Sequence, residues 1–231
     1  MLGKKASDII SGAIREAIKK NGSARILLAT GASQLGTYEQ LIKEDIEWDK
    51  VEMFHLDEYI GLPMTHGASF RKYLKERFVD LVHPKQAHFV DGEGNVTENI
   101  RTLTEVLRKA PIDVALIGIG ENGHIAFNDQ PANFDTDESY IRVALDERCK
   151  LQQVGEGWFS SLDEVPNEAI TMSVREIMKS RKIISIVPYK VKATAVRDTL
   201  YGEIGPMVPA SILRTHEDWT LLLDEDSASL L

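Results

Sequence analysis

The stretch Arg25-Ile26-Leu27-Leu28-Ala29-Thr30-Gly31-Ala32-Ser33 joins an apolar run directly to a glycine turn. Residues 26–29 are all apolar, with no polar residue in alternation, which predicts a strand that is buried on both faces. Such strands are typical of parallel sheets that are covered by helices on both sides. The stretch therefore predicts an α/β fold in which a buried strand leads through a tight turn into a helix.

Four further apolar runs have the same character, and segments with helical spacing separate them. The runs cover residues 51–56, 113–119, 182–187 and 219–223. The helical segments cover residues 34–44, 67–79, 97–109, 173–180 and 190–201, and an amphipathic helix with Ile9, Ile10, Ala13, Ile14 and Ala17 on one face precedes them. This alternation predicts a doubly wound, mostly parallel, Rossmann-like sheet with helices on both faces.

Residues 128–167 interrupt the alternation. The segment is irregular and rich in Asp, Glu, Asn and Gly, and it contains Pro131 and Pro166. Its composition predicts either a lid or a small subdomain. Because no Pro/Gly/Ser-rich linker divides the chain, we expect one domain over residues 1–231.

Composition and charge restrict the partners that the protein can have. The formal net charge of -9 repels polyanions, so a nucleic-acid partner is disfavoured. The single cysteine, Cys149, cannot form an intrachain disulfide, which fits a reducing compartment. There is neither a run near the ~18 apolar residues of a membrane span nor the apolar core of a secretory signal. We expect a cytoplasmic protein with a small-molecule ligand and no membrane partner, and self-association into a homo-oligomer is compatible with the sequence.

Polar side chains follow four of the predicted strands. Residues 30–33 follow the first, Asp57 and Glu58 follow the second, residues 118–124 end the third, and Lys192 lies just beyond the fourth. In open α/β sheets, ligands bind at the carboxyl ends of the strands. We therefore expect these side chains to gather at one edge of the sheet.

The turn Thr30-Gly31-Ala32-Ser33 has the features of an anion site. Gly31 permits unusual backbone angles, and the start of the next helix offers free N–H groups to an anion. The alternative is an ordinary helix cap formed by Ser33. Lys192 would supply the fixed cation that a phosphate requires, although a solvated helix lysine gives the same pattern.

Asp57 and Glu58 are adjacent carboxylates directly after a predicted strand. Neighbouring strand residues point to opposite sides, so only one of the two should face the site, and we choose Asp57. A carboxylate there can act as a general base that removes a proton from a carbon next to a carbonyl. A turn or capping aspartate is the alternative.

Residues 118–123 read Gly-Ile-Gly-Glu-Asn-Gly, which matches the GxGxxG pattern of dinucleotide-binding proteins. That interpretation fails because the pattern needs a helix at its third glycine, and residues 124–131 are too short and end in a proline. We expect Gly120 and Gly123 instead to let a sugar ring approach the backbone.

His124 follows these glycines, with Asn122 and Asp129 as polar neighbours. An imidazole held in this way can transfer a proton near neutral pH, whereas a histidine that only stabilises its loop is the alternative. The histidines show no convincing metal-ligand spacing, so no metal is expected.

Three stretches resemble the glucosamine-6-phosphate deaminase/isomerase family, which shares its fold with 6-phosphogluconolactonases. They are Ala29-Thr30-Gly31-Ala32-Ser33, Phe54-His55-Leu56-Asp57-Glu58-Tyr59-Ile60-Gly61-Leu62-Pro63 and Gly118-Ile119-Gly120-Glu121-Asn122-Gly123-His124-Ile125-Ala126-Phe127-Asn128. The order and spacing of the strands also fit, so the resemblance covers nearly the whole chain. The DEYIGLP and GHIAFN pieces together make it specific.

The resemblance implies deamination with aldose–ketose isomerisation of a hexosamine 6-phosphate, from glucosamine 6-phosphate to fructose 6-phosphate and ammonia, without cofactor or metal. In the implied reaction His124 helps to open the sugar ring, and Asp57 moves a proton between C2 and C1. The phosphate is implied to bind the turn at residues 30–33 and Lys192. The reaction would belong to the hydrolases and isomerases of amino-sugar catabolism.

Three positions depart from the family pattern. Asn122 replaces an aspartate that partners the histidine in well-known deaminases, Asp129 replaces the usual glutamate, and the phosphate-binding arginine has no counterpart. Arg148 and Lys150 lie in the region of that arginine. The alternatives are therefore a galactosamine-6-phosphate deaminase/isomerase, a 6-phosphogluconolactonase, and a non-catalytic sugar-phosphate-binding regulator.

Overall fold

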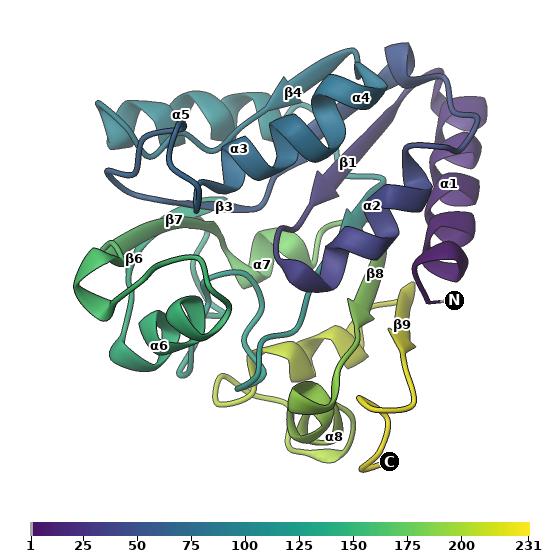
Figure 1. Cartoon of the computed structure of the whole chain (residues 1–231). Helices are drawn as coiled ribbons and strands as arrows, with labels where there is room; N and C mark the ends of the chain where they lie inside the picture. Colours follow the sequence, from purple (N-terminus) through teal and green to yellow (C-terminus); the bar gives the residue numbers. More distant parts are fainter. Residues whose placement is uncertain (1) are drawn as a thin grey trace.

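The computed structural model describes residues 2–231, which form two β-sheets and the helices around them (Figure 1). The larger sheet has six parallel strands in the order β4-β2-β1-β5-β8-β9. These strands are β1 (Ala24–Leu28), β2 (Val51–His55), β4 (Gln86–His88), β5 (Val114–Leu116), β8 (Lys182–Val187) and β9 (Trp219–Leu223). Counted along the chain, the order is 3-2-1-4-5-6, that of doubly wound dinucleotide-binding folds, and it confirms the predicted α/β class.

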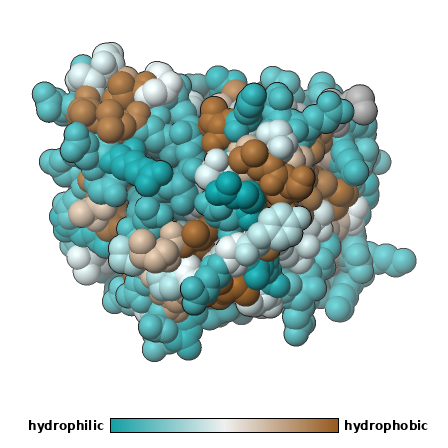
Figure 2. All heavy atoms as spheres, turned by 90° about the horizontal axis from the view of Figure 1, so that it is seen from below, coloured by the Kyte–Doolittle hydropathy of each residue, from teal (hydrophilic) through white to brown (hydrophobic). Residues whose placement is uncertain are grey.

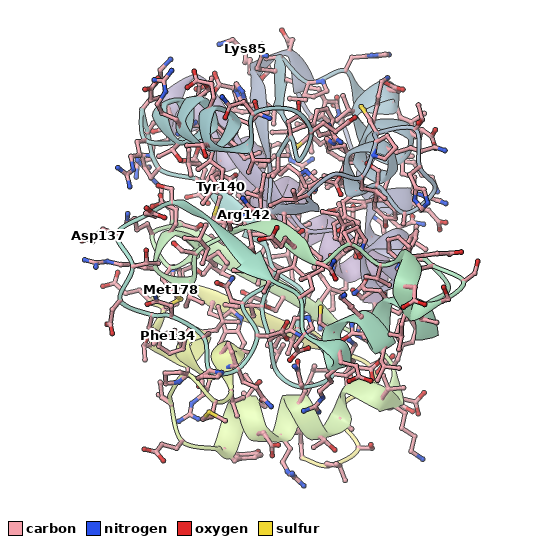
Figure 3. All side chains as sticks on the ribbon, turned by 90° about the vertical axis from the view of Figure 1, so that its left-hand side faces the viewer. Lys85, Phe134, Asp137, Tyr140, Arg142 and Met178 are labelled. Atoms are coloured by element: carbon pink, nitrogen blue, oxygen red, sulfur yellow. The ribbon has the colours of Figure 1, made fainter. Side chains whose placement is uncertain are left out.

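The smaller sheet has three antiparallel strands in the order β3-β7-β6. They are β3 (Asp57–Tyr59), β6 (Tyr140–Ala144) and β7 (Glu168–Met172). Figure 3 shows Tyr140 and Arg142 on β6, and Arg142 Nε donates to Glu168 Oε1 on β7 at 2.7 Å. The segment 128–167 is therefore only partly irregular: it contains β6 and helix α6 (Glu147–Gly155), which agrees with the small subdomain that was one of the two alternatives.

The helices occupy most of the predicted segments, with shifted ends. They are α1 (Leu2–Asn21), α2 (Leu35–Leu41), α3 (Phe70–Leu74), α4 (Asp80–Val82), α5 (Val96–Leu107), α7 (Val174–Ile177) and α8 (Ala193–Tyr201). A π-helical turn at Lys75–Val79 connects α3 to α4, and 3-10 turns lie at Ala32–Gln34, Trp48–Lys50, Leu162–Glu164, Lys190–Lys192 and Pro209–Thr215. The helix expected from residue 67 begins only at Phe70, because the Ser69 side chain caps it by accepting from Lys72 N. Within residues 2–231, no helix has the length and apolar character needed to cross a membrane.

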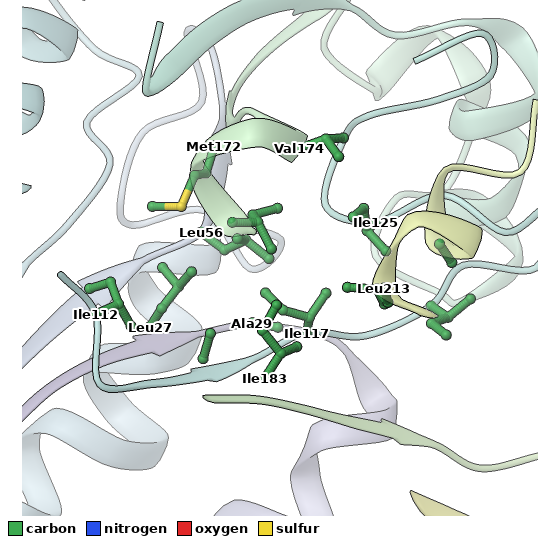
Figure 4. Close-up of a cluster of buried hydrophobic side chains, with 14 of the residues drawn as sticks. Leu27, Ala29, Leu56, Ile112, Ile117, Ile125, Met172, Val174, Ile183 and Leu213 are labelled. Carbon is green, nitrogen blue, oxygen red and sulfur yellow. The ribbon is translucent and has the colours of Figure 1, made fainter. Parts of the chain in front are cut away.

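Successive residues of β1 pack into opposite layers, as expected for a sheet that is covered on both faces. Ile26 and Leu28 belong to the core beneath α1 and α2, whereas Leu27 and Ala29 belong to the core on the other face. Figure 4 shows this second core, to which Leu27 and Ala29 on the larger sheet and Met172 on the smaller sheet all contribute. The apolar run of β1 is thus buried on both faces.

The two sheets are joined where β2 ends and β3 begins. Tyr140 Oη on β6 donates to the His55 carbonyl at 2.7 Å, and Met172 N on β7 donates to the Leu56 carbonyl at 2.9 Å. Leu56 N in turn donates to Leu28 O of β1 at 3.3 Å. These bonds fix the backbone directly before Asp57, the first residue of β3.

Candidate active site

A cavity of about 190 Å³ opens at the carboxyl edge of the larger sheet. It is lined by residues that follow β1 and β5, the two strands between which the strand order reverses. Ligands of doubly wound folds bind at such a switch point. Figure 2 views the molecule from the side of this edge, where apolar patches interrupt a mostly hydrophilic surface.

The turn after β1 forms one side of the cavity, and Thr30, Gly31, Ala32 and Ser33 all line it. Gly31 has φ 108° and ψ 165°, a backbone conformation that residues other than glycine rarely adopt. Tyr73 Oη donates to the Gly31 carbonyl at 3.1 Å and holds the turn from behind. The turn therefore presents the amino end of a helical segment and two hydroxyl groups to the cavity.

Asp57 and Glu58 separate as the strand alternation predicts. Asp57 lines the cavity, whereas Glu58 is fully buried on the other side of β3. The Glu58 carboxylate accepts hydrogen bonds from Ser69 Oγ at 2.8 Å and from the backbone N of Arg71 at 2.9 Å. It also forms an ion pair with the Arg71 guanidinium. The Glu58 carboxylate is thus occupied by bonds that stabilise the fold, and Asp57 is the carboxyl that a ligand can reach.

Burial and the neighbouring Glu58 raise the pKa of Asp57 to about 8. Only 5% of the residue is exposed, so its ionised form receives little stabilisation from water. A carboxyl with such a pKa can take up and return a proton near neutral pH, which is what a general acid–base group must do.

His124 lines the cavity and is oriented by two oxygen acceptors. Its Nδ1 lies 2.5 Å from Asn122 Oδ1 and 3.2 Å from Asp129 Oδ1, and Asn122 Nδ2 donates to the same Asp129 oxygen at 3.0 Å. Because both neighbours of Nδ1 are acceptors, Nδ1 carries the hydrogen, and Nε2 is the nitrogen that can exchange a proton with a ligand.

Burial by itself would raise the pKa of Asp129, but the hydrogen bonds and charge of His124, together with Asn122, hold that pKa below its usual range. Asp129 is therefore an ionised partner for the imidazole. It supplies the negative charge that Asn122 lacks.

Gly120 lines the cavity, as expected, whereas Gly123 does not. A Cβ on Gly120 would lie 2.1 Å from the ring of His124, so this glycine leaves room for the imidazole. Gly123 has φ 83°, packs against Val208 and does not line the cavity. The expectation that both glycines admit a sugar ring is thus not met by Gly123.

Lys192 is the cation of the cavity. It is 8% exposed and lines the cavity wall after β8. Within residues 2–231, no carboxylate lies within 4.0 Å of its ammonium group. Burial lowers the pKa of Lys192, and the charges of Glu156 and Glu121 oppose that shift. A buried ammonium group without an adjacent carboxylate favours a bound anion.

Helix α6 and the residues after it form a wall that the sequence analysis did not predict. Gln152, Gln153, Glu156 and Trp158 line the cavity, whereas Arg148 and Lys150 do not. Lys150 Nζ instead contacts Asn167 Oδ1 at 2.5 Å. No sequence signal identified these residues, because α6 has no strong apolar pattern and its placement depends on the smaller sheet.

Metal binding receives no support from the described residues. In residues 2–231, no three His, Cys, Asp or Glu side chains are grouped so that they could hold a metal ion. His55, which precedes Asp57 by two positions, is fully buried, and its Nδ1 accepts from Val90 N at 3.4 Å.

A carboxyl group that titrates near pH 8, an oriented imidazole and a buried lysine around one cavity suit acid–base chemistry on a small anion. Fold and cavity together define a doubly wound α/β enzyme for an anionic metabolite. The chain belongs to the family of glucosamine-6-phosphate isomerases and 6-phosphogluconolactonases, whose model matches residues 1–222.

Relatives within this family are similar over the full chain. A glucosamine-6-phosphate deaminase of Clostridium botulinum (strain Eklund 17B) is 36% identical over 100% of this chain and 92% of its own length. One of Thermoanaerobacter sp. (strain X514) is 35% identical over 100% and 91%. The solved structure of a monomeric glucosamine-6-phosphate deaminase superposes with a TM-score of 0.89 at 32% identity, covering 100% of this chain and 95% of that one.

The 6-phosphogluconolactonase of Thermotoga maritima has a TM-score of 0.80 at 17% identity over 96% of this chain and 94% of its own, which shows a shared fold. The relatives' names also correct one prediction. They place the reaction with the deaminases and isomerases, and the predicted hydrolase class was wrong.

Proposed function

We propose that this chain converts a hexosamine 6-phosphate, glucosamine 6-phosphate first among them, into a ketose 6-phosphate and ammonia. The observation that carries the proposal is the convergence of Asp57, His124, Lys192 and the turn at residues 30–33 on one cavity. The names of full-length relatives at 35–36% identity support the same substrate. Because both sheets contribute to the cavity, we further propose that residues 1–231 form one domain.

Binding of the phosphate relies on the turn and Lys192. The turn offers N–H groups and the hydroxyls of Thr30 and Ser33, and Lys192 offers a buried positive charge. With the phosphate at this end, the sugar extends along the cavity toward Asp57 and His124.

Ring opening is assigned to His124. Its Nδ1–H is held by Asn122 and Asp129, so Nε2 can accept the proton of the C1 hydroxyl and return one to the ring oxygen. The ionised Asp129 stabilises the imidazolium form that arises between these two steps.

Isomerisation is assigned to Asp57. In its ionised form the carboxylate removes the proton from C2 of the open aldose and returns it to C1, passing through an enol-type intermediate. Protonation at C1 leaves an imine at C2. A water molecule adds to that carbon, the C2 nitrogen leaves as ammonia, and the water oxygen becomes the ketone oxygen. After Asp57 has taken the C2 proton, it stays in its protonated form near neutral pH, because its pKa is about 8.

Ammonia release over a panel of hexosamine 6-phosphates, with 6-phosphogluconolactone hydrolysis measured in parallel, tests this function. We expect ammonia from at least glucosamine 6-phosphate, and release that is slower by about 10³-fold when Asp57→Asn replaces the native protein at equal folded concentration. Ammonia from no member of the panel, together with lactone hydrolysis, would select the lactonase alternative. Thermal stabilisation by the sugar phosphates with no turnover would select the regulator.

A further inference from the structure

Gln34 lies directly beneath the anion turn and is fully buried. Its side-chain Nε2 donates to Ser33 Oγ at 3.0 Å and to the backbone carbonyl of Ile186, on β8, at 3.5 Å. The amide thus connects the turn after β1 with the strand that leads to Lys192. Both the turn and Lys192 line the cavity.

The Ile186 carbonyl determines which way the Gln34 amide points. A backbone carbonyl can only accept a hydrogen bond, so the NH₂ end of the amide must face it. The same NH₂ group then donates its second hydrogen to Ser33 Oγ. Because the Ser33 hydroxyl is an acceptor in this bond, its own hydrogen remains available, and Ser33 lines the cavity.

The oxygen of the Gln34 amide, in contrast, makes no contact that would explain why a glutamine occupies this position. Gln34 Oε1 is buried and has no hydrogen-bond partner among residues 2–231. An unsatisfied buried carbonyl reduces stability, and an apolar side chain of the same shape would avoid that cost. Such a group in a native protein calls for an explanation other than packing.

We propose that Gln34 is a positioning residue that makes the Ser33 hydroxyl a dedicated hydrogen-bond donor to the phosphate group of the substrate. The inference rests on the proposed function, because it takes a phosphate monoester as the ligand of the turn. It adds a residue that touches no substrate atom and acts only through Ser33. In this interpretation, the stability lost at the unpaired Oε1 is a consequence of directing the NH₂ group toward Ser33.

A double-mutant cycle tests the proposal with Ser33→Ala, Gln34→Met and the double variant, using KM for glucosamine 6-phosphate and calorimetric Kd for inorganic phosphate. We expect Ser33→Ala to weaken both by about tenfold and Gln34→Met by about fivefold, with kcat little changed. In the Ser33→Ala background the Gln34→Met change should have no further effect. The melting temperature of Gln34→Met should stay close to that of the native protein, because methionine removes the unpaired Oε1 but also removes the donor to the Ile186 carbonyl.

Gln34→Glu is measured alongside, because it keeps the size of the side chain. Its carboxyl would accept the Ser33 hydrogen, so we expect a larger loss of phosphate affinity than with methionine. A fivefold effect of Gln34→Met that persists without the Ser33 hydroxyl would overturn the proposal, as would unchanged phosphate affinity in both Gln34 variants. Lys192→Met separates the two hypotheses: if it and Ser33→Ala both leave phosphate binding intact, the phosphate site itself is wrong. If only Lys192→Met weakens binding, the site stands and the role of Gln34 fails.

Discussion

The two sheets contribute to the cavity in different ways. The larger, parallel sheet contributes through the connections that follow its strands: the turn at residues 30–33, the loop with His124, and Lys192. The smaller, antiparallel sheet contributes Asp57 from within a strand, with Glu58 beside it on the opposite face. The groups from the larger sheet therefore lie on loops, whereas the proposed base lies in a paired strand. The chain before it, β2, pairs with β1, and β3, which begins with Asp57, pairs with β7.

The difference between Asp57 and Glu58 shows what strand pairing achieves. Both are carboxyl groups of one short strand, and both are buried. Glu58 is surrounded by hydrogen-bond donors and the Arg71 guanidinium, while Asp57 faces the cavity and its pKa is raised to about 8. One position thus stabilises the fold, and the neighbouring one is free for chemistry.

Replacing each of these two carboxyls by an amide should give the largest effects and should separate the role of Asp57 from that of Glu58. Asp57→Asn removes the base, so we expect kcat to fall about 10³-fold with the fold intact. Glu58→Gln is the matched control: it removes a buried charge that accepts from Ser69 Oγ and the Arg71 backbone, while Asp91 and Glu93 still pair with the Arg71 guanidinium, and it should lower the free energy of unfolding by about 2 kcal/mol. Ammonia assays and urea unfolding of both variants check this. A large loss of kcat in a stably folded Glu58→Gln protein would contradict the division of roles.

The pH dependence sharpens the same contrast. Only ionised Asp57 can remove the C2 proton, so kcat/KM should fall about tenfold for each pH unit below the pKa of about 8. The raised pKa also affects stability. The native carboxyl keeps a proton that the unfolded chain releases near pH 4, so this contribution favours the native state at low pH and is lost as pH rises through about 8.

Rate profiles and melting curves between pH 5 and 9 measure both effects. Asp57→Asn, which cannot titrate, should lack the fall in stability over that range. A native kcat/KM that stays constant from pH 8 down to pH 5 would show that Asp57 is not the group that limits the rate.

Removing the cation tests the contribution of the larger sheet. Lys192→Met should raise KM for the sugar phosphate about 100-fold, because it deletes a charge-assisted contact from a buried site, with a smaller change in kcat. Lys190→Met is the control, since Lys190 is exposed in the same turn and does not line the cavity. Equal effects of the two variants would mean that general positive charge, and not a specific contact, attracts the substrate.

Neutralising the acid behind the imidazole should have a more moderate effect. Asp129→Asn removes the charge beside His124 Nδ1, and we expect kcat to fall about tenfold with KM nearly unchanged. Asp135→Asn, an exposed position on the same loop, serves as control. A loss of kcat in Asp129→Asn that is no larger than in Asp135→Asn would contradict the partnership.

The smallest effect concerns the wall formed by α6 and the residues that follow it. Glu156 accepts from Gln152 Nε2 at 2.8 Å and Trp158 Nε1 at 3.1 Å, so its carboxylate is held at the cavity that also contains Lys192. Its charge opposes an incoming phosphate. Glu156→Gln should therefore lower KM about threefold. Glu147→Gln, which lies on α6 away from the cavity, should leave KM unchanged, and a raised KM in Glu156→Gln would show that this carboxylate binds the sugar.

Much of the larger sheet could be predicted because its strands carry their signal locally. Each of β1, β2, β5, β8 and β9 overlaps an apolar run that is visible in the sequence. The exception is β4 at the edge, which has three residues and pairs only with β2. Polar residues after buried strands were equally visible, and Asp57, His124 and Lys192 do line the same cavity.

The smaller sheet could not be predicted in the same way, because its strands are defined by partners far along the chain. Asp57 pairs with Thr171, and β6 lies within a segment that has no apolar run. The α6 wall depends on that sheet, so Glu156 and Trp158 carried no local signal. Gly120 was recognised as special, but the reason for it, the ring of His124, is a contact that appears only in three dimensions.

Deuterium incorporation is the most direct measurement of the proton transfer between C2 and C1, the step that is assigned to Asp57 and not to Glu58. Glucosamine 6-phosphate is converted in D₂O by the native protein and by Asp57→Asn, whose binding of inorganic phosphate is first shown to be normal. We predict that NMR will detect partial deuterium at C1 of the ketose made by the native protein, from turnovers in which the proton on Asp57 exchanges with solvent before transfer to C1, and neither ketose nor exchange at C2 above about a thousandth of the native rate with the variant. Ketose formation by a folded Asp57→Asn protein at the native rate would contradict the assignment of Asp57 as the base.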